Sequence, residues 1–205
     1  METKKLELEQ LFVGERLSLD FINTSCRRRE EVLEFLGTIE DAQKWLQFAE
    51  SVHNLPRFNS KMWDAEALHR ALGLRSALTE LVLAAIEKRP APSSAIETVN
   101  AFLHSNPTYR QIALTPDGLS ESTSAQISDN MWLIAIATDA IDLLCHSDLS
   151  LLRQCEHPTC VRVFYDTTKN HRRRWCVEKC GTHSKAAAYY RRKVAKNRLA
   201  ATKKS

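Results

Sequence analysis

The pattern of apolar and polar positions predicts a body built mostly from helices. Thr38 is followed three residues later by Asp41 and then by apolar residues at helical spacing, which is typical of a capped helix start. A longer apolar stripe predicts a second helix over residues 62–88. Gly73 lies in the middle of this helix, weakens it by about 1 kcal/mol relative to alanine, and indicates either a kink or close packing.

Two more helices are expected further along the chain. Ser94 and Glu97 have the spacing of a capping box before an apolar segment. Residues 125–145 form a strongly apolar segment that leads directly into a cysteine-rich region. The sequence therefore predicts a mainly α N-terminal domain over residues 1–148.

Two segments do not follow the helical pattern. Residues 108–123 alternate between apolar and polar types around a Pro-Asp-Gly turn, which predicts a β-hairpin. Residues 6–24 fit a helix and a strand equally well, so their pattern leaves the choice open. The expected fold class of the body is thus mainly α, or α+β with a small β-hairpin.

Composition is that of a folded protein. The chain has 205 residues, of which 43% are apolar and only 5 are glycine, which excludes collagen-like, low-complexity and fully disordered proteins. The longest apolar run, residues 131–137, is too short for a membrane span, and the first ten residues are too charged for a secretory signal. We expect no membrane association and a cytoplasmic location.

Charge is distributed unevenly along the chain. Residues 151–205 contain 15 Lys and Arg against 3 acidic residues, a net charge of +12. The preceding residues contain the other 14 basic and 22 acidic residues, a net charge of −8. A basic segment behind an acidic body favours a polyanionic partner, with a solubilising tail as the alternative.

The basic segment also contains a candidate metal site. Four cysteines are spaced C-x4-C-x15-C-x3-C, and two close pairs of this kind suit the four tetrahedral ligands of zinc. A disulfide pair is the less favoured alternative because a cytosolic chain is kept reduced. His157, His171 and His183 are alternative ligands. The predicted ligands of Zn²⁺ are Cys155, Cys160, Cys176 and Cys180.

A basic helix is predicted after the last cysteine. Gly181 is expected to supply a turn, Thr182 or Ser184 to cap the helix, and the run of Ala, Lys and Arg to continue it. A metal-fixed turn followed by a basic helix is suited to phosphate contacts and to entry into the major groove of duplex DNA. The predicted nucleic-acid contacts are Arg172, Arg173 and Arg174 in the loop and Lys185, Arg191, Arg192, Lys196 and Arg198 in the helix.

Two segments of the chain resemble known families. The four cysteines, the Phe-x-Asp-x-Thr turn at residues 164–168, the Arg-Arg-Trp-Cys at 173–176 and the Cys-Gly at 180–181 are similar to the CGNR zinc finger of bacterial transcription regulators. Residues 17–24 (LSLDFINT) resemble the signature of the ABATE domain, a stress-induced regulator domain that precedes this finger. The resemblance covers nearly the whole chain. One departure is Thr182-His183, where the family has Asn-Arg.

The resemblance implies a DNA-binding transcription regulator. It places an ABATE-like sensor or dimerisation domain over residues 1–148 and a small treble-clef or ribbon-like zinc module over residues 149–205. Sensing implies a small-molecule ligand, whose candidate contacts are Arg16, Asp20, Asn23 and Arg75. As an alternative, Asp20 and Asn23 brace neighbouring backbone amides.

Other functions stay open at this point. An RNA-binding or ribosome-associated zinc protein is the main alternative. A nuclease using Asp166, His171 or His183 is disfavoured because four thiolates leave no open position on zinc, so catalysis is not indicated. Oxidation of the thiolates would give a redox role. A symmetric dimer is expected for a regulator that reads paired half-sites, although the sequence shows no heptads and no obvious apolar interface.

Overall fold

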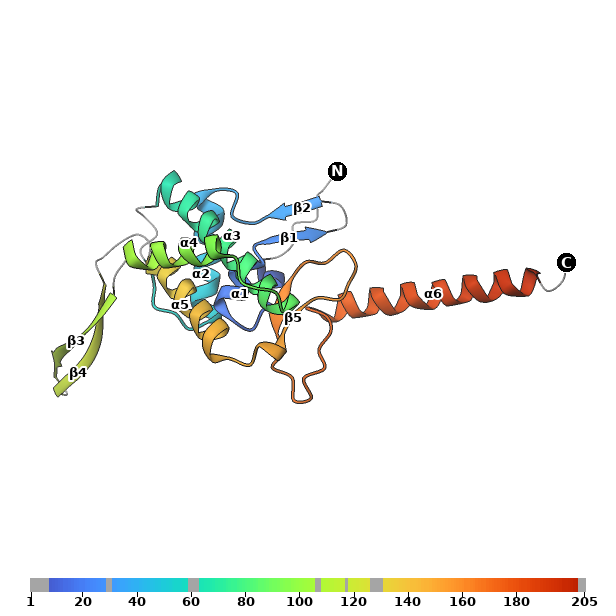
Figure 1. Ribbon diagram of the computed structural model, residues 1–205. Helices are drawn as coiled ribbons and strands as arrows, with labels where there is room; N and C mark the ends of the chain where they lie inside the picture. Colours follow the sequence, from blue (N-terminus) through green and yellow to red (C-terminus); the bar gives the residue numbers. More distant parts are fainter. Residues whose placement is uncertain are drawn as a thin grey trace.

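The computed structural model describes residues 8–28, 31–58, 63–105, 108–116, 118–125 and 131–202. Helices form most of the body, and the last helix extends away from it (Figure 1). The helices are α1 (Leu17–Ile22), α2 (Ile39–Val52), α3 (Ala65–Glu87), α4 (Ser93–Ser105), α5 (Met131–His146) and α6 (Glu178–Thr202), with 3-10 turns at Leu8–Leu11 and Leu149–Leu151.

The strands of the described residues form two-stranded antiparallel hairpins. They are β1 (Ser25–Arg28) with β2 (Glu31–Glu34), β3 (Thr108–Thr115) with β4 (Gly118–Ala125), and β5 (Leu152–Gln154) with β6 (Val163–Tyr165). The mainly α body with a small β component, followed by a four-cysteine module that ends in a helix, confirms the predicted fold class.

Helix α1 lies at the centre of the body, in contact with α3, α5 and β6. All six of its residues are buried, so it has no polar face. A helix buried on every side lacks the periodicity that distinguishes helix from strand, which is why the pattern of residues 6–24 left the choice open. Asp139 of α5 accepts hydrogen bonds from the backbone N–H of Ser18 at 2.8 Å and from Arg16 Nε at 2.9 Å, and so caps α1 from another helix.

Aromatic residues fill the core around this helix. Trp132 of α5 stacks on Trp63 with ring centroids 4.6 Å apart and meets the ring of Phe21 edge-on. Trp45 of α2 and Leu78 of α3 are fully buried in the same cluster. Residues of α1, α2, α3, α4 and α5 all belong to this cluster, so the body has one continuous hydrophobic core.

Several predicted elements are confirmed. The Thr38 side chain accepts a hydrogen bond from the Asp41 N–H at 3.1 Å and caps α2. Helix α3 occupies the predicted segment, and the predicted hairpin is β3–β4, with Gly118 at φ +116° in its turn. Helix α3 runs through Gly73, where an added Cβ would meet no atom within 4 Å, so close packing at this glycine was wrong.

Other local predictions need correction. Ser94 lies inside α4 instead of at its cap, and the N–H groups of Ala95 and Ile96 instead donate to the carbonyl oxygen of Pro92. The β1–β2 hairpin was not predicted. It is held by Glu34, which accepts hydrogen bonds from Arg75 of α3 at 2.7 and 2.5 Å, a contact between residues far apart in sequence.

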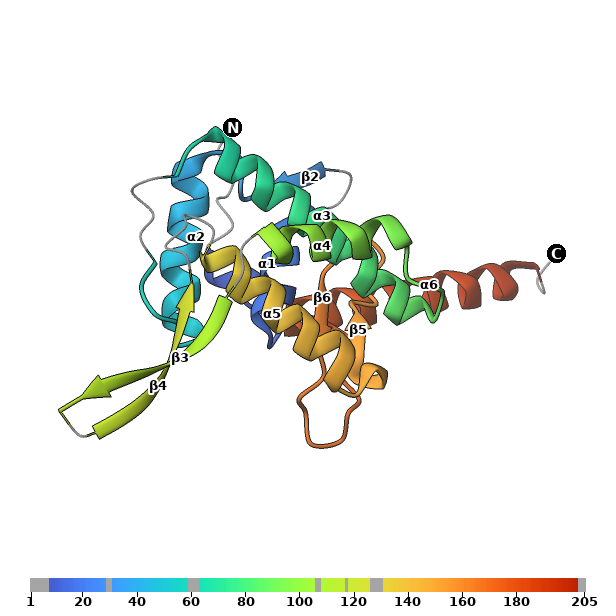
Figure 2. The same ribbon diagram turned by 60° about the vertical axis from the view of Figure 1, so that its left-hand side comes forward.

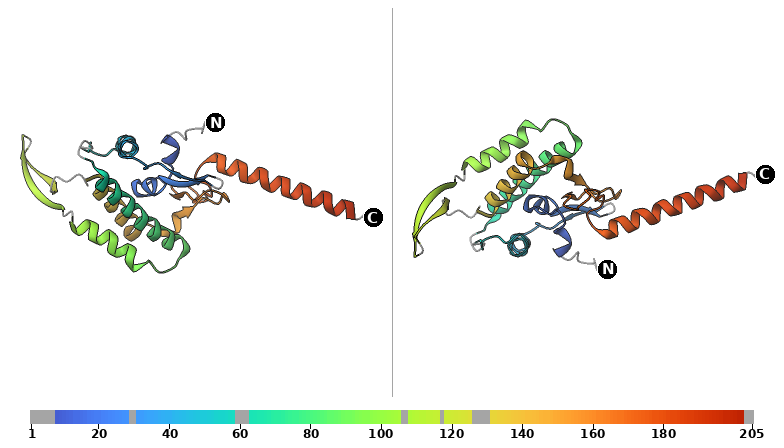
Figure 3. Two further views of the ribbon diagram at one scale, coloured as in Figure 1. Left: turned by 90° about the horizontal axis from the view of Figure 1, so that it is seen from above. Right: turned by 90° about the horizontal axis from the view of Figure 1, so that it is seen from below.

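Two elements project from opposite ends of the molecule. The β3–β4 hairpin, hereafter the arm (residues 108–125), points away from the body, and α6 extends in the other direction (Figures 1 and 2). Views from above and below show the same arrangement (Figure 3). Among the described residues, no helix is long and apolar enough to cross a lipid bilayer.

Candidate metal centre and nucleic-acid interface

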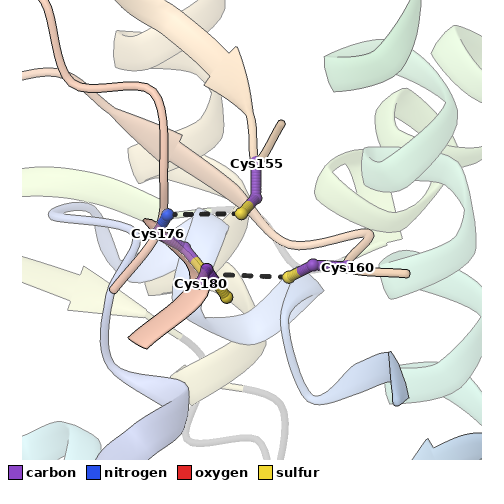
Figure 4. A group of neighbouring side chains, drawn as sticks. All are labelled: Cys155, Cys160, Cys176 and Cys180. Atoms are coloured by element: carbon purple, nitrogen blue, oxygen red, sulfur yellow. Dashed lines mark hydrogen bonds between the residues drawn. The ribbon is translucent and has the colours of Figure 1, made fainter. Parts of the chain in front are cut away.

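The four predicted ligands come together from three parts of the C-terminal segment (Figure 4). Cys155 directly follows β5, and Cys160 closes a tight turn in which its N–H donates to the His157 carbonyl at 2.9 Å. Cys176 ends the loop after β6, and Cys180 lies in the first turn of α6. The module thus consists of the β5–β6 hairpin, whose connection carries two cysteines, then a loop and a helix, as expected for the small treble-clef or ribbon-like module.

The distances between the sulfur atoms fit a zinc ion. All four Sγ atoms lie within 4.8 Å of one another. The Cys160–Cys176 and Cys176–Cys180 Sγ separations are 3.7 and 3.8 Å. Tetrahedral zinc with Zn–S bonds of about 2.3 Å places its sulfur ligands about 3.8 Å apart. The cluster consists of cysteines alone among the described residues, without His157, His171 or His183.

The pKa values of the four cysteines also bear on metal binding. Hydrogen bonds from Cys160 and Cys176 lower the pKa of Cys155 to about 2. Hydrogen bonding to Cys155 raises the pKa of Cys160, and raises that of Cys176 to about 12, while burial and neighbouring thiolates raise that of Cys180 to about 12. The thiols therefore resist full ionisation together, and a bound Zn²⁺ would supply the compensating positive charge. The cysteines are positioned to bind zinc.

Helix α6 begins earlier than predicted because Cys180 belongs to it. The helix starts at Glu178, so Gly181 lies inside the first turns and Thr182 and Ser184 are not its caps. Thr182 instead donates a hydrogen bond to the Glu178 carbonyl at 3.2 Å. The predicted turn at Gly181 was wrong. A Cβ at this position would lie 2.9 Å from Cε3 of Trp175, so close packing of the indole on the helix requires glycine here.

Asp166 organises the turn between β6 and the loop arginines. Its side chain is fully buried, and its oxygens accept hydrogen bonds from the Thr168 hydroxyl at 2.5 Å and the Arg173 N–H at 2.8 Å. Burial raises the pKa of this carboxyl, but these hydrogen bonds outweigh it and lower the pKa below its usual value. Both carboxylate oxygens thus accept hydrogen bonds that hold the loop in its conformation.

Arg173 points inward and joins the zinc module to the body. Its guanidinium donates to Glu15 Oε1 at 2.8 Å, to the Val13 carbonyl at 3.0 Å and to the Cys176 carbonyl at 2.7 Å. It also lies over the Phe164 ring, 4.5 Å from the centroid. The sequence offered no signal for this role, because a run of three arginines looks uniformly exposed.

Basic residues of the loop and of helix α6 meet at the Trp175 ring, and others are exposed nearby in the sequence. The Trp175 ring has Arg174 at 5.0 Å and Lys185 at 5.4 Å from its centroid, so the indole links loop and helix. Arg174 also pairs with Glu156 and remains more than half exposed. Arg172, Lys185, Arg191 and Arg192 are exposed, and the side chains of Lys196 and Arg198 lie outside the described residues.

The four candidate ligand-binding residues of the body all have partners within the protein. Arg16 pairs with Asp139, and Arg75 donates to Glu34 and to the Thr24 hydroxyl. The Asp20 carboxylate accepts a hydrogen bond from the Gly14 N–H at 2.7 Å and lies 2.9 Å from His53 Nε2. Burial raises the pKa of Asp20, and the hydrogen bonds act to lower it.

Asn23 links α1 to the zinc module. Its amide donates to the Val163 carbonyl at 2.9 Å, and its oxygen accepts from the Val163 N–H at 2.9 Å. Leu152 and Val163, the first residues of β5 and β6, belong to the same hydrophobic cluster as α1 and α3. The zinc module is therefore docked on the body through its hairpin, and the domain boundary near residue 148 stays a prediction.

A cavity of about 410 Å³ lies at this junction. Helix α3 forms one wall, and the end of α1 and the β5–β6 hairpin form the other. Asn23 and Arg75 contribute to its lining, whereas Arg16 and Asp20 do not. The lining is mixed: Leu72, Leu83 and Val163 are among its apolar residues, and Ser76, Thr79, Glu80 and Gln154 are among its polar ones.

Two protein-family models match the chain. The model named ABATE, described as "Putative stress-induced transcription regulator", matches residues 15–147. The model of the CGNR zinc finger matches residues 152–193. A search of curated proteins found no match. The order of the two matches agrees with the resemblance found in the sequence, and the second match contains all four clustered cysteines.

Proposed function

We propose that this chain, which belongs to the ABATE family of transcription regulators and carries a CGNR zinc finger, binds duplex DNA through its zinc module and α6. The observation that carries the proposal is the basic face in which Trp175 joins Arg174 of the loop to Lys185 of α6. These two cations can reach neighbouring phosphates of one duplex because they lie against the same indole ring.

The geometry of α6 supports this proposal. The helix has 25 residues and is about 37 Å long at 1.5 Å per residue, and it extends away from the body (Figure 1). Its exposed residues include Arg191, Arg192 and Lys193. The major groove of duplex DNA is wide enough to admit an α-helix. The acidic body adjoins the N-terminal end of α6, and the C-terminal part of the helix extends away from it (Figure 1).

Zinc would act here as a structural ion. Cys180 ties the first turn of α6 to the other three ligands, so the ion fixes the direction in which the helix leaves the module. Arg173 and Asn23 then transmit this orientation to the body. With four thiolate ligands the coordination is complete, which favours a binding role over a catalytic one.

The test is the salt dependence of DNA affinity for one substitution in the proposed interface. Arg192→Gln should weaken binding to many duplex sequences and reduce the slope of log affinity against log salt by about 0.9, because one phosphate contact is lost. Fluorescence anisotropy of labelled duplexes measures this slope.

Lys44→Gln is the matched control, since Lys44 is an exposed cation on α2 of the acidic body. It should leave the slope unchanged. Equal slopes for Arg192→Gln and the wild type would remove Arg192 from the interface. A preference for structured RNA over duplex DNA at equal salt would favour the RNA-binding alternative instead.

Sequence specificity needs a separate experiment. Genomic fragments selected with the zinc-loaded protein should be enriched for a few intergenic regions, and this enrichment should vanish for Cys176→Ser, which lacks one ligand. Uniform weak enrichment that moderate salt abolishes would show that the module binds only backbone charge.

We further propose that the junction cavity is where the body senses a small molecule. A ligand there would touch α3 and the β5–β6 hairpin together, and would thereby change how the zinc module sits on the body. A compound from a metabolite library should raise the melting temperature of the wild type but not of Ser76→Trp, which fills the cavity. A compound that stabilises both proteins equally binds elsewhere.

A further inference from the structure

The arm carries a cluster of large apolar side chains that its own body leaves uncovered. Ile112, Leu114 and Leu119 are 78%, 83% and 77% exposed. Ile112 and Leu114 are two residues apart in β3, and Leu114 pairs directly with Leu119 in β4. Alternate residues of a strand and directly paired residues point to the same side of a ribbon, so the three side chains share one face.

The strands of the arm lack the residues that usually block pairing at a sheet edge. It is a two-stranded ribbon, and no third strand pairs with it among the described residues. An isolated two-stranded hairpin is at best marginally stable in water. Exposed edges are usually blunted by lysine, proline or bulges, but neither strand contains Lys or Pro and their register has no bulge. Such a ribbon is suited to pairing with another strand or another face.

The features of the arm favour a second copy of this chain as its partner. By sequence its strands contain one basic residue, Arg110, and one acidic residue, Glu121, so the ribbon has no net charge that would repel a second copy. The arm lies at the opposite end of the molecule from α6, so pairing two arms leaves both basic helices free (Figure 3). We propose that the arm is a self-association surface through which two chains form a symmetric dimer.

The surface that one arm offers is small for a dimer interface. Eight-residue strands are about 26 Å long, and two of them are about 10 Å wide, so one face covers roughly 250 Å². Stable interfaces bury about 800 Å² per partner, so the arms alone support only a weak, concentration-dependent dimer. The inference does not depend on DNA binding, because its readout is the mass of the protein in solution.

The test is sedimentation equilibrium of the full zinc-loaded chain over a micromolar concentration series. The wild type should approach twice the 23.4 kDa mass of one chain as its concentration rises. The double variant Leu114→Asp, Leu119→Asp should dimerise at least about a hundredfold more weakly, because its two-fold contact loses four buried leucines and gains repelling charges. Zinc content and melting temperature establish that the variant is folded.

Val32→Asp is the matched control. Val32 is 64% exposed on a strand of the other small hairpin, β1–β2, and its substitution should leave the dissociation constant unchanged. Hydrogen exchange of the wild type supplies a measurement that needs no variant: the amides of residues 108–125 should gain protection as the concentration rises. A wild type that stays monomeric, a double variant that still dimerises, or an arm without added protection would each overturn the proposal.

Discussion

Two helical glycines in this chain differ in what surrounds them. Gly181 lies against the Trp175 indole, and a Cβ there would meet ring carbons at 2.9 and 3.1 Å. Gly73 has nothing within 4 Å of the same position. Both lie in helices, where glycine is disfavoured, so only the first has a packing reason to be glycine.

We therefore expect alanine to act in opposite directions at these two positions. Gly181→Ala should lower the free energy of unfolding by about 1–3 kcal/mol, because it pushes the indole out of its site between Arg174 and Lys185. Gly73→Ala, the control, should raise it by about 0.5–1 kcal/mol. Chemical denaturation followed by far-UV circular dichroism measures both. A stabilising Gly181→Ala would show that Trp175 does not pack on α6.

At the scale of elements, the contact between β2 and α3 depends on one ion pair. Glu34 accepts two hydrogen bonds from the Arg75 guanidinium, and the N–H of Leu36 donates a third at 2.8 Å. Burial acts to raise the pKa of Glu34, but these hydrogen bonds and the charge of Arg75 outweigh it and lower the pKa below 4.5. The β1–β2 hairpin is held against α3 in this way.

The lowered pKa predicts an acid-sensitive contact. The folded protein binds a proton at Glu34 less readily than the unfolded chain, so the stabilisation is complete above about pH 4.5 and is lost as the pH falls through the folded-state pKa. Glu34→Gln should lower the free energy of unfolding at pH 7 and reduce its further loss in acid. Urea denaturation at pH 7 and pH 3.5 measures both effects, with Glu97→Gln on the exposed side of α4 as control. An equal acid loss in Glu34→Gln and the wild type would contradict the prediction.

At the scale of the whole molecule, the zinc module and the body share contacts that make them interdependent. Val163 belongs to the main hydrophobic cluster, and its backbone forms two hydrogen bonds with the Asn23 side chain. The Tyr165 N–H donates to the Gly14 carbonyl at 2.9 Å, and Arg173 reaches Glu15. The metal centre is therefore connected to α1, the most buried helix of the body.

Removal of zinc should accordingly destabilise more than the module. A chelator under reducing conditions should lower the melting temperature of the full chain, because loss of the four-ligand site frees β5 and β6 and weakens the contacts to α1. Hydrogen exchange should show lost protection in residues 152–180 and at Asn23. Helix α4, which packs on α3 and α5, should keep its protection. An unchanged melting temperature would mean that the body is stable without the module.

The sequence by itself determined the features that depend on local pattern or on residue chemistry. Thr38 and Asp41 marked the start of α2, the Pro-Asp-Gly turn marked the arm, and the spacing of four cysteines identified the metal site with all its ligands. These predictions succeed because a helix cap, a hairpin turn and a tetrahedral thiolate site are each specified by residues within one short segment of the chain.

Only the tertiary structure decided the features that depend on contacts between distant residues. Asp139 caps α1 from another helix, Glu34 meets Arg75 across 41 positions, and Arg173 turns inward to Glu15, 158 positions away. The close approach of Trp175 to Gly181 is equally invisible in the pattern. The physical reason is that a pattern reports which face of an element is apolar, whereas packing selects the partner that a buried polar group or a small residue meets.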